Sequence, residues 1–409
     1  MKKILIMCMV LTQGVASFAQ KYAVIDAEAK YKEACANQAE INFKKLDEAW
    51  KTIEACMENE KSKDYYDTYR VAALIKNVTV SQLYNKGRES GNLDTLAYFT
   101  GLKEILGYYS TEDRLLHTPN DKGKLPLKED ETKKAHTLAQ QSALPLRQNM
   151  LLGGSALVNS NPQKAIELID VYLKSFDDPL YKELNLNERD TLKSAAYLYT
   201  GMALKNMAQT WEDTLNYLSY YEKVIDTQAY GAYSCVEIMN TYKRHGDIAN
   251  WEKFCKMAME KFPEDQQYPK LLIQEYVNSN RKDEALAVCE QMSKAFPKEI
   301  FPLETRALMM FNDKKYKESI DLFKQLTELD PTYGRAWCSL GTSYYQLAME
   351  NKDNYKVCKE YLDLAIPAYK KAEEVEPDNP ALWGYYLYHC YKALSDKTNE
   401  AKYKKYEKQ

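Results

Sequence analysis

The chain has 409 residues, in which 56 Lys and Arg face 59 Asp and Glu, so the formal net charge is −3. This balance argues against a nucleic-acid partner, because neutralising phosphates requires clustered basic residues in excess. Only 14 Gly and 13 Pro interrupt the chain. So few helix breakers favour an all-helical protein.

The first 19 residues predict a signal peptide. A basic head, Met1 to Lys3, precedes an apolar run of about a dozen residues and a small-x-small site that ends at Ala19. The apolar run is too short to cross a bilayer, which takes about 20 residues. We therefore expect cleavage after Ala19 and an exported protein, periplasmic or secreted, with no transmembrane segment.

The next part of the chain predicts helices interrupted once. Residues 20–110 carry apolar side chains at three- and four-residue steps, which predicts degenerate, repeat-like helical hairpins. Residues 111–134 hold turn residues around Gly123 and a charged run, which predicts a loop or hinge. Residues 135–231 predict irregular helical repeats. There Gly153 suits close helix packing better than a nucleophile elbow, since no G-x-S-x-G is present.

A period of 34 residues governs the second half of the chain. Pro263, Pro297 and Pro331 are spaced by 34, and each follows a helix-like run that a proline would end. We expect regular helical hairpins over residues 232–379, with about 12 extra residues inserted near 349–362. Tyr242, Tyr276, Met310 and Tyr344 have the same 34-residue spacing, so we expect them to be equivalent, buried positions of the repeat. Residues 380–409 predict a final helix and a basic capping helix.

Residues 337–344 match a known repeat opening position for position. Their sequence WCSLGTSY has the W-x2-L-G-x2-Y pattern of a tetratricopeptide repeat (TPR). The second half of that pattern follows, in Ala365, Tyr369, Ala372 and Pro377. The chain thus resembles TPR proteins, and among them the exported TPR proteins of Bacteroidetes-type bacteria. The resemblance implies an all-α fold, an α-solenoid of antiparallel helix hairpins wound as a TPR superhelix. It also implies a non-catalytic scaffold that binds a protein or peptide partner in a concave groove.

In the TPR family, positions 2, 5, 9, 12 and 13 of each repeat line that groove. Carried onto this chain, the resemblance implies the partner-binding residues Asn240, Lys243, Arg244, Gln274, Asn278, Phe301, Leu308, Phe311, Arg335, Tyr345, Gln346 and Tyr388. Phe301, Leu308 and Phe311 share one helix face, which serves either a partner or packing between repeats. The pattern that clamps a chaperone's carboxyl terminus is not kept, because Val236 and Leu271 replace polar residues of that clamp. A chaperone tail is therefore not the expected partner.

The sequence offers no pattern for catalysis, metal or cofactor binding. The four histidines, at 117, 136, 245 and 389, are scattered and form neither HExxH nor a Cys/His zinc spacing. We therefore expect no enzyme activity, no cofactor and no metal. The alternative function is a carbohydrate-binding accessory protein of the bacterial envelope, since 34 tyrosines could stack on sugar rings.

Cleavage after Ala19 would leave eight cysteines, and packing is the expected role for most of them. Cys255, Cys289 and Cys390 occupy slots that the repeat buries, where a thiol behaves as a small hydrophobe. An alternative remains for one pair. Cys235 and Cys255 should face each other across a hairpin, where a disulfide is conceivable if their Cα atoms lie within about 7 Å.

Overall fold

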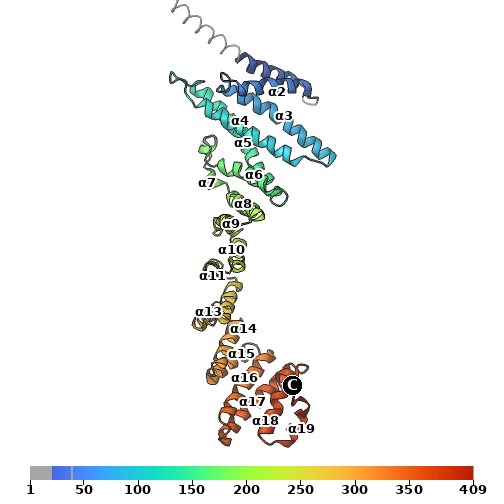
Figure 1. Cartoon of the computed structure of the whole chain (residues 1–409), viewed down its shortest axis with the longest axis vertical. Coiled ribbons are helices and arrows are strands. Elements are labelled where there is room, and N and C mark those ends of the chain that lie inside the picture. The colour runs from blue at the N-terminus through green and yellow to red at the C-terminus, as the bar shows by residue number, and fades with distance from the viewer. Residues whose placement is uncertain (1–20, 38–39, 409) are drawn as a thin grey trace, which may run out of the picture. The chain divides into compact units, whose positions relative to one another are not determined.

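A computed structural model describes residues 21–37 and 40–408, and the predicted signal peptide lies outside them. Figure 1 shows helices throughout this part of the chain, and none of the described residues is in a strand. The all-α solenoid prediction is therefore confirmed. No helix of the described part combines the length and apolar character that crossing a membrane would take. The chain divides into two compact units, Met1–Ser234 and Cys235–Gln409.

In the first unit the long helices pack against one another in chain order. Residues 21–34 are helical, and α2·α3, α3·α4, α4·α5, α5·α6, α6·α8 and α8·α9 are in contact. The elements are α2 (Phe43–Glu58), α3 (Tyr66–Ser90), α4 (Thr95–Leu116), α5 (Glu129–Leu157), α6 (Pro162–Lys174), η1 (Pro179–Leu184), α7 (Leu186–Arg189), α8 (Lys193–Met207) and α9 (Trp211–Glu222).

The second unit continues the same sequential packing, from α11·α12 to α18·α19. Its elements are α10 (Gly231–His245), α11 (Ile248–Lys261), α12 (Gln267–Asn278), α13 (Lys282–Ala295), α14 (Ile300–Asn312), α15 (Tyr316–Leu329), α16 (Gly334–Glu350), α17 (Tyr355–Val375), η2 (Pro380–Leu382), α18 (Gly384–Ala393), α19 (Lys397–Tyr403) and η3 (Lys404–Tyr406). The boundary between the units falls inside α10.

The helix ends follow the prolines that the 34-residue period picked out. Helices α11, α13 and α15 end at Lys261, Ala295 and Leu329, each two residues before its proline. Proline has no N–H for a helix bond and its ring clashes with the preceding turn, so a helix stops just before it. The predicted ends of these three helices are confirmed.

The turn inside each of these hairpins repeats one backbone conformation. Gly246, Asn280 and Lys314 have φ angles of 79°, 58° and 60°. The next residue donates its N–H back into the finished helix in every case: Asp247 to the Tyr242 carbonyl at 3.0 Å, Arg281 to Tyr276 at 2.7 Å, and Lys315 to Met310 at 2.9 Å. A left-handed residue followed by this backward bond is the Schellman motif, which satisfies carbonyls at a helix end.

The predicted insertion near 349–362 lengthens helices and adds no separate element. Helix α16 has 17 residues and α17 has 21, against 13 in α14 and 14 in α15. The turn between the two long helices stays short, because α16 ends at Glu350 and α17 starts at Tyr355. The extra residues therefore extend one hairpin by added helical turns.

Two glycines permit helices to approach closely. A Cβ on Gly341 would lie 2.8 Å from the ring of Tyr369, and one on Gly153 would lie 2.5 Å from the ring of Phe99. Tyr369 is fully buried and stacks on Tyr386 at 4.9 Å between ring centroids. The glycine of the W-x2-L-G-x2-Y motif is thus a packing position, and so is Gly153, as its sequence context indicated.

The interruption predicted over residues 111–134 is shorter in the structure. Helix α4 continues to Leu116 and α5 begins at Glu129, so only residues 117–128 lie between them. The charged run that suggested a loop forms the first turn of α5, where three acidic residues face the positive end of the helix dipole. Helices α4 and α5 pack against each other within the first unit.

None of the eight cysteines of the described residues forms a disulfide. Cys235 and Cys255 form no disulfide, so the alternative offered for that pair is wrong. Both are fully buried, as are Cys289 and Cys390, and the thiol of Cys255 lies 3.4 Å from the carbonyl oxygen of Tyr268. Burial raises the pKa of Cys255 to about 12 and that of Cys289 to about 11.

Candidate functional site

The predicted groove residues fall on the first helices of the hairpins in the second unit, and most of them reach solvent. We call this set the first-helix face: the residues at repeat positions 2, 5, 9, 12 and 13 of α10, α12, α14 and α16. The exposed ones are Asn240, Lys243, Arg244, Gln274, Asn278, Leu308 and Arg335, and the half-buried ones are Phe301, Phe311, Tyr345 and Gln346.

Large aliphatic side chains are exposed on three successive first helices. Val236 on α10, Val277 on α12 and Leu308 on α14 are 41–42% exposed, and each stands at a groove position of its repeat. Helices α12 and α14 are in direct contact. Sequence reasoning found Leu308 but treated Val236 only as a departure from the chaperone clamp, and it missed Val277. Val277 could have been found from the sequence, because it stands at position 12 of its repeat, which is a groove position.

The two phenylalanines of the face, Phe301 and Phe311, already contact other side chains of the chain. The ring of Phe311 meets that of Tyr316 edge to face, with centroids 5.3 Å apart. The ammonium of Lys270 lies 6.0 Å from the centre of the Phe301 ring and 3.3 Å from a carboxylate oxygen of Glu299. Leu308, between them in sequence, is the most exposed apolar residue of α14. It is therefore the most accessible apolar side chain that this helix offers.

Several cations of the face also have partners. Lys243 pairs with Glu275 on α12, and its ammonium lies 4.3 Å from the centre of the Trp251 ring. Arg244 donates to the hydroxyl of Thr241 at 3.3 Å. These contacts hold the charged groups in place beside the exposed aliphatic residues, so the face combines apolar side chains with a polar surround.

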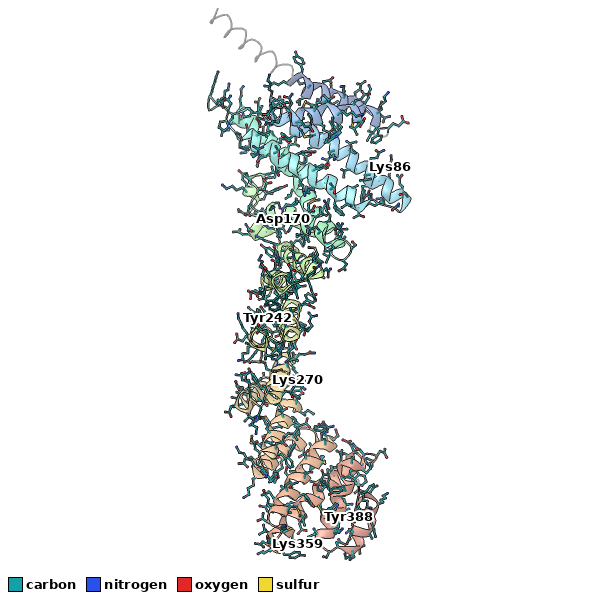
Figure 2. The ribbon with its side chains drawn as sticks, viewed as in Figure 1. Lys86, Asp170, Tyr242, Lys270, Lys359 and Tyr388 are labelled. Atoms are coloured by element: carbon teal, nitrogen blue, oxygen red, sulfur yellow. The ribbon has the colours of Figure 1, made fainter. Side chains whose placement is uncertain are left out.

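Tyr388 departs from the expectation for a groove residue. Its side chain is 3% exposed, and its hydroxyl donates to Glu407 at 2.7 Å, which raises its pKa. Figure 2 labels Tyr388 in the C-terminal part of the chain, where η3 packs on α18. The end of the chain thus covers this tyrosine, and we leave it out of the first-helix face.

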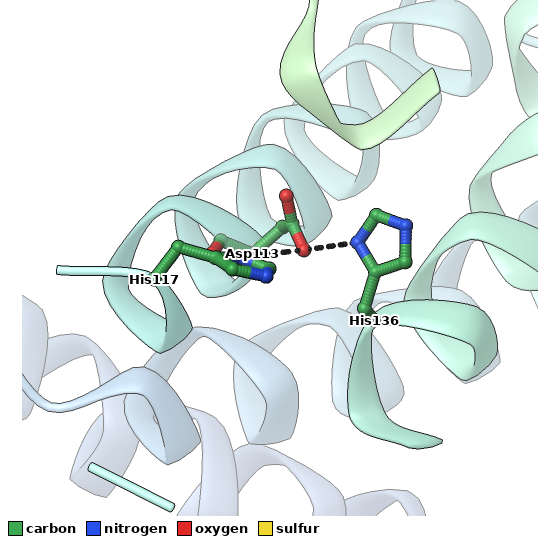
Figure 3. A group of neighbouring side chains, drawn as sticks. All are labelled: Asp113, His117 and His136. Atoms are coloured by element: carbon green, nitrogen blue, oxygen red, sulfur yellow. Dashed lines mark hydrogen bonds and ion pairs between the residues drawn. The ribbon is translucent and has the colours of Figure 1, made fainter. Parts of the chain in front are cut away.

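A second candidate site, in the first unit, was missed by the sequence analysis. Asp113 and His117 lie one turn apart at the end of α4, and His136 faces them from α5 (Figure 3). The Nδ1 atom of His136 is 2.6 Å from Oδ1 of Asp113, and Nδ1 of His117 is 3.4 Å from the same oxygen. Asp113 is buried, His136 is mostly buried, and the His117 side chain is 51% exposed. The two histidines are therefore not scattered in space.

These three residues open into a cleft of about 890 Å³ between α4, α5 and η1. Its wall carries charges of both signs, in Arg114, Glu129, Lys133, Asp178, Lys182 and Glu183. Ser110 of α4 donates to Asp178 at 2.6 Å, which ties α4 to the start of η1. Thr132 of α5 also lines the cleft, and its buried hydroxyl has no hydrogen-bond partner within residues 21–37 and 40–408.

A sequence signal for this second site exists, although it is weak. Asp113 and His117 are separated by four residues, as are Thr132 and His136. On two helices, each such pair shares a face. The signal could have been found by treating 113–117 and 132–136 as helical, but the predicted loop over 111–134 removed both segments from consideration.

Comparisons with known proteins give no family for the chain. No family model matches it, and no curated protein does. Solved structures similar to it include MamA of AMB-1, with 19% identity over 46% of this chain and 94% of MamA at a TM-score of 0.31. Yeast Tom70 has 14% identity over 87% of this chain and 92% of its own, at a TM-score of 0.29. The TPR2AB domain of yeast Sti1, in its pHSP90 complex, has 17% identity over 75% and 95%, at 0.24. Likenesses at these TM-scores say nothing about a partner or an activity.

Proposed function

We propose that this chain is an exported, non-catalytic TPR scaffold that binds a protein partner through the first-helix face of its second unit. The observation that carries the proposal is the exposure of Val236, Val277 and Leu308 on three successive first helices. Single exposed apolar residues are ordinary on protein surfaces, whereas exposed apolar residues at groove positions of three successive repeats favour an interaction surface. The polar residues around them supply the rim that protein interfaces have.

The chemistry of the face fits a helical or extended peptide segment of the partner. Aliphatic side chains at Val277 and Leu308 would take an apolar anchor of that segment. Gln274, Asn278 and Arg335 would hydrogen-bond its flanking polar groups or backbone. An apolar centre within a polar rim is the arrangement in which a few residues dominate binding energy.

Substitution of the exposed leucine tests this proposal. Leu308→Glu places a charge where the anchor would bind. Because the Leu308 side chain is exposed, α14 should stay folded in this variant, and thermal unfolding checks that it does. Arg335→Glu tests the rim. We expect each variant to weaken the partner at least tenfold, which corresponds to about 1.4 kcal/mol. The measurement is crosslinked capture from an envelope fraction, followed by affinity titration of the captured protein.

The matched control is Leu364→Glu, on the second helix α17. Leu364 is 50% exposed, so this variant makes the same chemical change outside the first-helix face. It should capture the partner as the unaltered chain does. Equal capture by the Leu308→Glu and Leu364→Glu variants would contradict the proposal. Phe311→Ala is a poorer probe, because Phe311 packs on Tyr316 and its loss also costs packing energy.

Export is the part of the proposal that rests on the first 19 residues alone. A basic head, an apolar run and a small-x-small site support cleavage after Ala19. N-terminal sequencing of the protein made in its native host should begin at Gln20, in the envelope or the medium. A chain that keeps Met1 and stays in the cytoplasmic fraction would contradict export without affecting the first-helix face.

The carbohydrate-binding alternative is not favoured by the tyrosines. Six of them are among the largest fully buried side chains, namely Tyr172, Tyr181, Tyr221, Tyr276, Tyr369 and Tyr403. The most exposed ones, Tyr22 and Tyr355, lie in different units. Sugar binding by stacking needs aromatic rings gathered on one exposed surface. Tyrosine serves mainly as packing in this chain.

A further inference from the structure

We propose that Asp113, His117 and His136 bind one divalent transition-metal ion of the zinc type. The three side chains come from two packed helices, α4 and α5, and can each offer one ligand atom within 4.8 Å of the other two. The site lies in the first unit, so it is separate from the first-helix face and does not depend on the proposed function.

The spacing of the ligand atoms suits a small tetrahedral ion. With bonds of about 2.0–2.1 Å, two ligand atoms of such an ion lie about 3.3 Å apart. Oδ1 of Asp113 and Nδ1 of His117 are already separated by 3.4 Å. Nδ1 of His136 stands at 2.6 Å from the same oxygen, as a hydrogen-bonded pair. Binding an ion would replace this hydrogen bond, and the contact of His117 Nδ1 with the Asp113 carbonyl oxygen, by metal bonds. Side-chain rotation would then bring the three ligand atoms, which lie within 4.8 Å of one another, to about 3.3 Å apart.

The types of ligand select the ion. Two imidazole nitrogens and one carboxylate oxygen form a set that zinc and neighbouring transition metals bind. Mg²⁺ and Ca²⁺ prefer six or more oxygen ligands, and the cluster offers one carboxylate. Three protein ligands leave a tetrahedral ion one further position, which water can fill. The cleft of about 890 Å³ gives that water access.

The surroundings of the cluster contain a second indication of a ligand. Thr132 stands one turn before His136 on α5 and lines the same cleft. Its side chain is buried, and its hydroxyl has no hydrogen-bond partner among the described residues. A buried hydroxyl without a partner is costly unless a water or bound group satisfies it. A metal-bound water in the cleft is a partner of the right kind.

The simpler alternative is that Asp113 and His136 form a hydrogen-bonded pair without any metal ion. It explains the contact between Asp113 and His136, which needs no ion. In that arrangement His117 makes only local contacts: its Nδ1 lies 2.9 Å from the Asp113 carbonyl oxygen at the end of α4, and its ring meets that of His136 edge to face, with centroids 5.7 Å apart. The metal site and the metal-free Asp–His pair therefore differ in the role of His117, so substitution of His117 distinguishes them.

Zinc titration of the purified full chain tests the proposal. The protein is stripped with a chelator, dialysed, and titrated with Zn²⁺ in a calorimeter, with Mg²⁺ as the comparison ion. We expect one Zn²⁺ per chain and no measurable Mg²⁺ binding. The variants His117→Ala, His136→Ala and Asp113→Asn should each lose at least tenfold in Zn²⁺ affinity. The matched control His245→Ala removes an exposed histidine of the second unit and should bind as the unaltered chain does.

His117→Ala gives the cleanest result because its side chain is half exposed and its loss should leave the fold intact. Circular dichroism and thermal unfolding in chelator check that point. Zn²⁺ should raise the unfolding temperature of the unaltered chain and of His245→Ala, but not that of a His117→Ala/His136→Ala double variant. Three outcomes overturn the proposal: no Zn²⁺ binding, undiminished affinity in His117→Ala, or a double variant that still binds, which would assign the ion to the thiols.

Discussion

Glu252 on α11 connects three consecutive helical segments through one carboxylate. It accepts hydrogen bonds from the Tyr276 hydroxyl and from Arg281, both at 2.6 Å, and Lys256 lies at 2.6 Å from the same group. These partners, Arg281 first, hold the pKa of Glu252 at about 2, below its ordinary value of 4.5. The folded state thus favours the ionised carboxylate.

This shift predicts an acid-dependent loss of stability. A carboxyl group whose pKa is lowered by folding contributes its full stabilisation above its unfolded pKa of 4.5, and loses it as the pH falls towards 2. The unaltered chain should therefore unfold at a higher temperature than Glu252→Gln at pH 7, and the difference should shrink between pH 4.5 and pH 2. Thermal unfolding across that pH range measures it.

The control for this prediction is Glu284→Gln. Glu284 also pairs with Arg281, at 2.5 Å, but its side chain is 48% exposed, and exposed pairs contribute little. The unfolding temperature of the Glu284→Gln variant should equal that of the unaltered chain at every pH. If Glu252→Gln also ran parallel to the unaltered chain down to pH 2, the ionised Glu252 would contribute nothing to the folded state.

Tyr388 shows why residue positions carried over from a repeat can fail. The repeat pattern places it at a groove position, and α18 forms as the pattern requires. Glu407, 19 residues later, covers it, and no repeat position specifies what the end of the chain does. Positions in the middle of the array, such as Asn240, Gln274 and Leu308, have no such cover and are exposed.

At the scale of elements, the turns between paired helices carry the most specific demand on sequence. Gly246, Asn280 and Lys314 occupy the same left-handed conformation 34 residues apart. Glycine adopts it freely and asparagine tolerates it, whereas a lysine pays about 1–2 kcal/mol for its Cβ. Lys314 is therefore the strained member of the three.

Lys314→Gly should stabilise the second unit by about 0.5–1 kcal/mol, because relief of the strain exceeds the entropy that a glycine loses on folding. Gly246→Ala should destabilise it by about 1 kcal/mol for the converse reason. Urea unfolding followed by circular dichroism measures both. Lys324→Gly, an exposed position in the middle of α15, is the control and should lower stability by about 1 kcal/mol. A Lys314→Gly variant that lost as much stability as this control would show that the turn is unstrained.

The elements divide into those that the sequence specifies locally and those that depend on packing. Helices α11, α13 and α15 could be predicted because a proline stops each one and the hydrophobic period runs up to it. The start of α5 could not, since its first turn is all charged. Its buried residues Thr132, Ala139 and Ala143 do lie on one face, at helical spacing. The helical spacing of these buried residues thus indicated the start of α5 better than its charged first turn did.

The candidate metal cluster left only a weak signal in the sequence, for a related reason. Asp113 and His117 stand at the end of α4 and His136 stands on α5, and the three meet only because these two helices pack side by side. Short motifs record ligands held within one helix or one turn. Asp113 and His136 satisfy no such motif, so only the packed helices reveal them.

At the scale of the whole molecule, the fold class followed from features spread along the entire chain: few glycines and prolines, and apolar spacing of a helical kind throughout. The division into two compact units was less accessible. It falls after Ser234, inside α10, where neither composition nor a proline marks a break. A helix that continues through a boundary leaves no local signal in the sequence.

The buried thiols have a practical consequence for work on this molecule. Thiolate is the form that reacts with alkylating reagents and disulfides. Burial raises the pKa of Cys255 to about 12 and those of Cys289 and Cys338 to about 11. At a pKa of 12 only about one thiol in 10⁵ is ionised at pH 7. A cysteine introduced at an exposed position would react far ahead of these three, so they can be left in place when a fluorophore or spin label is attached, whereas Cys35, which is only half-buried, should be replaced first.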